Sequence, residues 1–126
     1  MNKEVLGKTF AAGDVIVKQG EVGDCMFVIQ EGDCAVFKEE DGHETQIDVM
    51  NAGDIFGEMA ILERQKRSAT IRAIGTVRVL TIDKKTFLRR VQEDPSLAFM
   101  VLRAMSNRVR RLDIELAELK AEKDCN

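Results

Sequence analysis

The segment 56–69 holds the residues of this sequence that are best suited to bind a ligand. Gly57 tolerates backbone conformations that a side chain would oppose. The helix formers that follow, residues 58–62, suffice for little more than one helical turn. The amides of Met59 and Ala60 then lie in the first turn, where they have no partner within the helix and favour an anion.

Arg67, Ser68 and Glu58 indicate what that anion would be. The guanidinium of Arg67 can pair a phosphate through two parallel hydrogen bonds, and Ser68 adds a hydroxyl and an amide donor. The carboxylate of Glu58 would repel a phosphate, but it can accept a hydrogen bond from a sugar hydroxyl. Hydrogen-bond donors for a phosphate, next to an acceptor for a sugar hydroxyl, indicate a pocket for a ribose phosphate.

The first part of the chain, which must position this segment, has the pattern of a small β-structure. All nine glycines lie within residues 1–75, with short apolar runs between them. Short strands with a turn every ~8–12 residues are typical of a sandwich or barrel. Asp41-Gly42 predicts a hairpin turn, and the near repeat of 12–16 (AGDVI) at 52–56 (AGDIF) predicts a rolled sheet with similar edges. The expected strands are Val15–Val17, Cys25–Ile29, Cys34–Phe37 and Ile47–Met50.

The second part of the chain has helical patterns. Asp83 can cap a helix over residues 84–91, and Asp94-Pro95 can open a longer helix that runs toward Lys123. Apolar residues along the longer helix alternate in spacing between three and four, as at the a and d positions of a coiled coil. We therefore expect a parallel homodimer; the alternative is a helix packed on its own sheet. This seam consists of Leu102, Met105, Val109, Leu112, Leu116 and Leu119.

Length and composition limit the class of protein. A chain of 126 residues, 44% hydrophobic and 33% charged, predicts a single α+β domain over 1–126, with strands over about 7–82 and helices over about 83–123. The net charge of −3 divides into −9 over residues 1–58 and +6 over 59–126, and it argues against a general nucleic-acid coat. No apolar run approaches the roughly 18 residues of a membrane span, and the start lacks a leader pattern, so we expect a cytoplasmic location.

Enzymatic and metal-binding functions have little support in the sequence. The three cysteines, Cys25, Cys34 and Cys125, lack the spacing of a zinc or disulfide framework, and inert thiols are the expectation. The single histidine, His43, follows the predicted hairpin turn and should be exposed rather than bind haem. No nucleotide-hydrolysis or dinucleotide motif is present. We expect a binding protein without catalytic residues, metal or cofactor.

The ordered motifs resemble the cyclic nucleotide-binding domain family. Residues 56–62 (FGEMAIL) followed by 67–69 (RSA) are similar to its phosphate-binding cassette, and the upstream motifs at 13–16 (GDVI) and 20–24 (GEVGD) agree. The resemblance spans roughly residues 7–112. It implies an antiparallel β-roll of the double-stranded β-helix or jelly-roll type, a short cassette helix and C-terminal helices.

The resemblance also implies roles for individual residues. Glu58 would accept the ribose 2′-hydroxyl, and Arg67 would pair the cyclic phosphate. The cassette glycine and the residues beside these two would assist, an apolar wall would contact base and sugar, and a lid would come from the last helix. The assisting residues are Gly57, Met59, Ala60, Ser68 and Ala69, the wall is Val36, Ile47 and Met50, and the lid is Leu112 with Arg108, Arg111 or Asp113.

Two further features of the sequence bear on the ligand and on the output of such a protein. Ser68 after the arginine is similar to bacterial cyclic AMP sensors, so we favour cyclic AMP over cyclic GMP. The chain ends at Asn126, soon after the seam, which leaves no room for a DNA-reading helix; direct DNA binding is not expected. The alternative function is a dimerisation module of the same fold that binds another ligand or none.

Overall fold

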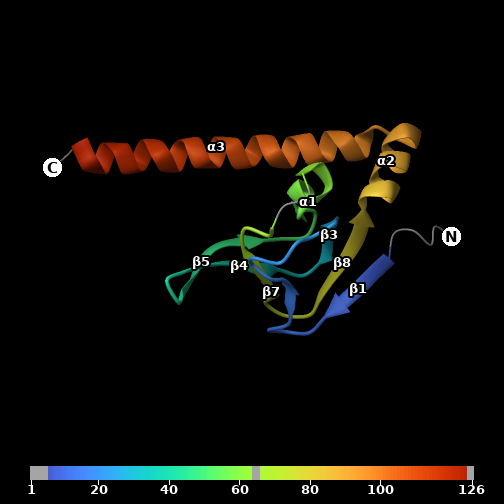
Figure 1. The fold of residues 1–126 in the computed structure, drawn as a ribbon, viewed down its shortest axis with the longest axis horizontal. Coiled ribbons are helices and arrows are strands. Elements are labelled where there is room, and N and C mark those ends of the chain that lie inside the picture. Colours follow the sequence, from blue (N-terminus) through green and yellow to red (C-terminus); the bar gives the residue numbers. More distant parts are fainter. Residues whose placement is uncertain (1–5, 64–65, 125–126) are drawn as a thin grey trace.

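The computed structural model describes residues 6–63 and 66–124; Cys125 lies outside them. Within these residues, two four-stranded antiparallel sheets have the orders β1-β8-β3-β6 and β2-β7-β4-β5, and helices follow the last strand (Figure 1). This α+β arrangement confirms the predicted fold class. The strands are β1 (Leu6–Phe10), β2 (Val15–Val17), β3 (Cys25–Glu31), β4 (Cys34–Glu40), β5 (His43–Met50), β6 (Ile55–Phe56), β7 (Thr70–Ala73) and β8 (Val77–Asp83). The helices are α1 (Glu58–Glu63), α2 (Lys84–Glu93) and α3 (Ser96–Asp124).

The repeated Gly-Asp sequences form two equivalent turns, as the near repeat predicts. Gly13 and Gly53 have φ values of +85° and +93°. The carboxylates of Asp14 and Asp54 each accept a hydrogen bond from the amide three residues earlier, at 2.9 and 2.8 Å. Each glycine amide then donates to a strand carbonyl at 2.8 Å, from Gly13 to β7 and from Gly53 to β3. One local sequence therefore builds the corresponding turn at both sheets.

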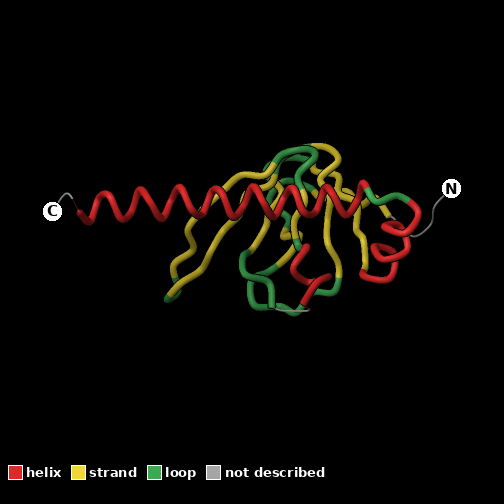
Figure 2. Tube along the Cα trace, turned by 90° about the horizontal axis from the view of Figure 1, so that it is seen from above, coloured by secondary structure: helices red, strands yellow, loops and turns green. Residues whose placement is uncertain are grey.

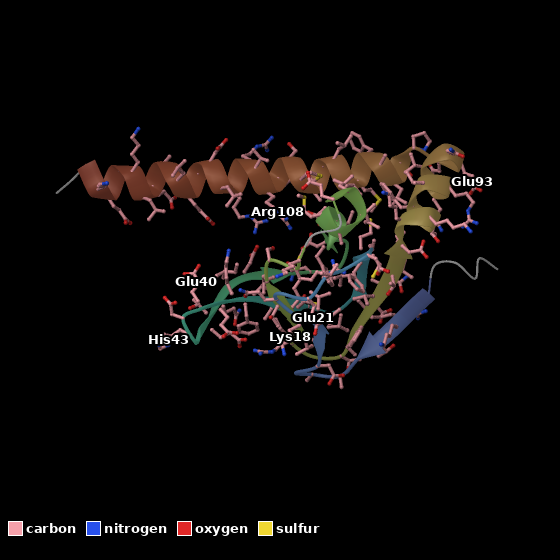
Figure 3. The ribbon with its side chains drawn as sticks, viewed as in Figure 1. Lys18, Glu21, Glu40, His43, Glu93 and Arg108 are labelled. Carbon is pink, nitrogen blue, oxygen red and sulfur yellow. The ribbon has the colours of Figure 1, made fainter. Side chains whose placement is uncertain are left out.

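The β4–β5 hairpin turns at Asp41-Gly42, as expected. Both residues have positive φ, +53° and +81°, the combination that a two-residue type I′ turn requires. His43 begins β5 and is exposed. Figure 3 labels His43 and Glu40 at this tip, far from the helices. The expected exposure of the histidine is confirmed.

Strand β3 carries apolar side chains on both faces, because it lies between two hydrophobic clusters. Phe27 and Ile29 belong to the cluster between the sheets, where the rings of Phe27 and Phe56 stack with centroids 4.9 Å apart. Met26 belongs to the second cluster, which joins the roll to α1, α2 and the start of α3. Together with Ile55 of β6 and Ile82 of β8, β3 thus fixes the helices to the roll, because its side chains alternate between the two clusters.

Capping carboxylates start both C-terminal helices where the sequence predicts. Asp83 accepts a hydrogen bond from the Thr86 amide at 2.7 Å, and Asp94 accepts one from the Ser96 amide at 3.0 Å. These bonds lower the pKa of each carboxyl group. From the second cap, α3 crosses over the roll above α1, and its C-terminal end extends past the strands (Figures 1 and 2).

Replacing Asp83 with alanine should lower the free energy of unfolding by about 1 kcal/mol at pH 7, because the Thr86 amide loses its acceptor. The lowered pKa means that this stabilisation is complete above the unfolded-state value of about 4 and is lost as pH falls through the folded-state pKa. Urea unfolding at pH 7 and at pH 3 measures the effect, with Glu93→Ala as control. An equal loss at both pH values would contradict the capping assignment.

Candidate functional site

One cavity of about 580 Å³ lies between the β-roll, α1 and α3. The sheet that contains β4, β5 and β7 forms one wall, and side chains of α3 form the opposite wall. The structure brings twelve site residues that the sequence predicts to this one cavity, although they come from separate parts of the sequence. They are Val36, Ile47, Met50, Gly57, Glu58, Met59, Ala60, Arg67, Ser68, Ala69, Arg108 and Leu112.

Gly57 directs the chain from β6 into α1. Its φ of +81° belongs to the left-handed region, where a side chain would be strained. Its carbonyl accepts hydrogen bonds from the Ala60 amide at 3.1 Å and from Arg67 Nη1 at 3.4 Å. In this structure the Ala60 amide is therefore directed at Gly57 within the turn. Met59 is 38% exposed at the cavity, and Ala60 is buried.

Glu58 is the first residue of α1, and its side chain is only 2% exposed. One carboxylate oxygen, Oε1, is paired with Arg108 Nη1 of α3 at 3.1 Å. The other oxygen, Oε2, is buried and finds no hydrogen-bond partner among the described residues. A buried acceptor without a donor costs about 1–3 kcal/mol. The site therefore presents an acceptor that a ligand hydroxyl can satisfy.

Arg67 lines the same cavity as Glu58 and is half-buried. Its Nη2 donates to the Cys25 carbonyl at 2.9 Å, and its guanidinium lies over the Phe27 ring with Cζ 5.6 Å from the centroid. With the bond to Gly57, two carbonyls and one ring orient the guanidinium. Since an arginine has five N–H donors, donors remain for an anion in the cavity. Ser68 and Ala69 continue this side of the cavity.

Two ion pairs connect α3 to the site. Besides Arg108 with Glu58, Arg111 pairs with Asp48 of β5. Figure 3 shows Arg108 on the side of α3 that faces the roll. Leu112 adds apolar surface on the same wall and is 56% exposed. The helix therefore covers the cavity and interacts with carboxylates from two parts of the roll.

Sequence reasoning missed four charged residues of the cavity: Lys38, Asp48, Lys66 and Glu115. Two strand positions could have been found by alternation, because Lys38 is two residues from Val36 and Asp48 is two residues from Met50. Glu115 is three residues beyond Leu112 and so lies on the same helix face. With them, the cavity is lined by five cationic and three acidic residues, a net charge of +2.

The two described cysteines are poor nucleophiles. Burial raises the pKa of the Cys25 thiol, although the neighbouring Arg67 charge acts in the opposite direction. Burial, assisted by Asp33, raises the pKa of the Cys34 thiol to about 11. Both thiols are therefore neutral near pH 7. Among residues 6–63 and 66–124, no group of three His, Cys, Asp or Glu side chains is arranged to hold a metal ion.

Comparison with known proteins identifies the family. The family model of the cyclic nucleotide-binding domain matches residues 7–94, more than half of the chain. The chain belongs to the cyclic nucleotide-binding domain family. The resemblance drawn from the motifs is confirmed. The name of the family refers to cyclic nucleotides as its ligands.

Individual relatives are similar over much of this chain. A cAMP-dependent protein kinase regulatory subunit of Mucor circinelloides f. lusitanicus is 41% identical over 80 residues, 64% of this chain and 19% of the relative. The structure of cAMP-bound PfPKA-R is 32% identical with a TM-score of 0.71, over 90% of this chain and 38% of that one. The Thermus thermophilus catabolite activator protein shares the fold, with a TM-score of 0.83 at 24% identity, over 93% of this chain and 55% of that one.

The chain spans about a fifth of the length of the curated kinase regulatory subunits that it matches. No described helix is long and apolar enough to cross a membrane.

The Arg108–Glu58 ion pair generates a prediction for the ligand-free protein. Arg108→Ala should lower the free energy of unfolding by roughly 1–3 kcal/mol, because it leaves the buried carboxylate without its charged partner. Adding Glu58→Gln should recover part of this loss, since a neutral amide is less costly to bury. Urea unfolding of the two single variants and the double variant measures the coupling. Additive losses would show that the ion pair does not stabilise the protein.

Proposed function

We propose that the cavity binds a 3′,5′-cyclic nucleotide. The observation that carries this proposal is the unsatisfied, buried Oε2 of Glu58 in the same cavity as the guanidinium of Arg67. A ribose 2′-hydroxyl can donate to Oε2, and the cyclic phosphate can pair with Arg67. A ligand that carries a hydroxyl and a phosphate on one sugar satisfies both groups together.

The charge and size of the cavity support an anionic ligand of this kind. Arg108 and Arg111 pair with Glu58 and Asp48, so four of the lining charges largely cancel. The net charge of +2 that results from all the lining residues suits the single negative charge of a cyclic phosphate. A volume of about 580 Å³ lies within the ordinary range for small-ligand sites.

Cyclic AMP is the nucleotide that we favour over cyclic GMP. Two curated relatives, each 41% identical over about 80 residues, are named as cAMP-dependent protein kinase regulatory subunits. Ser68, beside Arg67, supports the same choice through the resemblance to bacterial sensors. The apolar side chains of Val36, Ile47 and Met50 would then contact the base and sugar.

The proposed output is a change in the position of α3. Its two ion pairs to the roll end on Glu58 and Asp48, and both carboxylates line the cavity. A nucleotide that donates to Glu58 and lies beside Asp48 changes the groups with which Arg108 and Arg111 interact. Ligand binding would thereby shift the preferred position of the helix.

A parallel homodimer through α3 is part of the proposal. Five of the six seam residues remain 56–65% exposed, whereas Met105 packs partly against the second cluster. An exposed apolar seam with this heptad spacing is stabilised when a second helix covers it. The exposed members are Leu102, Val109, Leu112, Leu116 and Leu119.

Arg67→Leu should weaken cyclic AMP binding roughly 10- to 100-fold, because a charge-assisted pair with the phosphate is lost. Isothermal titration with cyclic AMP and cyclic GMP measures the affinities. The control is Arg72→Leu: Arg72 pairs with Glu44, and neither residue lines the cavity. Thermal unfolding of both variants shows whether the roll remains folded.

Undiminished affinity in the Arg67→Leu variant would refute the phosphate assignment. If the unaltered protein released no heat with either nucleotide and neither displaced the other, the nucleotide proposal would fail as a whole. The dimerisation module without this ligand would then be the better description.

Charged residues in the seam should prevent dimerisation. We expect Val109→Lys with Leu116→Lys to give a monomeric mass in light scattering, because lysines at two a positions oppose each other across the helix pair. Neither residue lines the cavity, so nucleotide affinity reports separately on the site. Ile114→Lys is the control: Ile114 is 54% exposed on α3 but outside the seam. A dimeric mass in the double variant would contradict the proposed interface.

A further inference from the structure

The turn at residues 20–23 contacts Arg67 directly, although the two are separated by more than forty residues in sequence. The Gly20 amide donates to the Arg67 carbonyl at 2.9 Å, and the Arg67 amide donates to the Glu21 carbonyl at 2.7 Å. Val22 and Lys66 form a β-bridge beside this pair. Figure 3 labels Glu21, which lies in this turn. The backbone on both sides of Arg67 is therefore fixed by one turn of the roll.

Gly23 extends this contact to the Arg67 side chain. A Cβ atom built on Gly23 would lie 2.2 Å from Cζ and Nε of Arg67 and 2.3 Å from its Nη2. Real Cβ atoms do not approach other atoms so closely, so the guanidinium occupies the space that any other residue would fill. Gly23 is absent from the glycines with positive φ, so its backbone conformation does not itself require glycine.

Gly57 differs from Gly23 because its backbone conformation does require glycine. A Cβ atom on Gly57 would also meet Arg67, with Nη1 at 2.6 Å, but the φ of +81° strains any substitution there. The Cys25 carbonyl would lie at 3.1 Å as well. A variant of Gly57 would therefore change the backbone and the arginine together. At Gly23 the observed conflict is with the Arg67 side chain.

We infer that Gly23 is a positioning residue for the ligand: the absence of its side chain creates the space that holds the Arg67 guanidinium against the Cys25 carbonyl. The methyl group of an alanine at this position displaces the guanidinium, and the 2.9 Å hydrogen bond to Cys25 is lost. Because the displaced atoms are the end of a flexible side chain, the fold persists while the arginine moves away from the phosphate. This inference rests on the proposed nucleotide site.

The test is a double-mutant cycle between Gly23→Ala and Arg67→Leu, read as cyclic AMP affinity by isothermal titration. Gly23→Ala should weaken binding roughly 5- to 50-fold in the protein with Arg67, because a charged hydrogen-bond donor is misplaced. In the Arg67→Leu background the same substitution should change affinity by less than about twofold. The matched control is Gly75→Ala, since Gly75 has no atom within 4 Å of an added Cβ and no positive φ.

Each result of the cycle decides the inference. An equal loss in both backgrounds, or no loss in either, would overturn it. If Gly23→Ala failed to fold, folding restored by Arg67→Leu would support the conflict with the arginine, and failure of both proteins to fold would overturn it. Arginine Nε–H NMR signals of the ligand-free protein provide a reading that does not depend on nucleotide binding. Gly23→Ala should shift the Arg67 signal and Gly75→Ala should not; an unmoved signal would overturn the inference even if no nucleotide binds.

Discussion

The buried carboxylate of Glu58 is the constraint on which the arrangement of the site depends. Removing a charge from water is costly, and burial to 2% exposure is tolerated only with a compensating partner. Arg108 provides that partner from α3, so one ion pair joins the cassette helix to the longest helix. Since this pairing satisfies one oxygen and leaves Oε2 without a donor, the ligand-free site retains an unmet interaction. The same residue thus links the helix to the roll and offers an acceptor to a ligand.

Arg67 shows how the roll prepares a cation without neutralising it. Its direct partners among the described residues are carbonyl oxygens, the sulfur of Cys25, a ring face and backbone groups rather than a carboxylate. Carbonyls and an aromatic face orient the guanidinium while its charge remains available for an anion. Glu58 and Arg108, by contrast, form an ion pair. Among the described residues of the cavity, Arg67 therefore has no carboxylate partner, whereas the charge of Arg108 is already paired with Glu58.

The sequence predicted the fold class, four of the eight described strands and both C-terminal helices, because these signals are local. The Gly-Asp turns, the hairpin at Asp41-Gly42 and the Asp83 cap each depend on neighbouring residues, and the structure contains them all. The presence of both Ile47 and Asp48, adjacent residues, at the cavity depends instead on a register shift: Val36 is opposite Asp48, but Phe37 is opposite Gln46. The residue between, Ile47, has no partner in this register, and it lines the cavity together with Asp48. Nothing in the local sequence specifies that bulge. The contact of Gly23 with Arg67 was also unforeseen, because it joins segments far apart in the chain.

The division of α3 into three parts explains how a change at the cavity can act at a distance. Its first turns are anchored in the second cluster through Val101, its middle carries Arg108 and Arg111 over the cavity, and its last part extends past the strands. The helix has 29 residues, and at 1.5 Å per residue its length is about 43 Å. A small rotation about the anchored end therefore produces its largest displacement at the far end. Leu116 and Leu119 lie there, exposed, so under the proposed movement of α3 a surface that covers them would be displaced by a change in the two ion pairs.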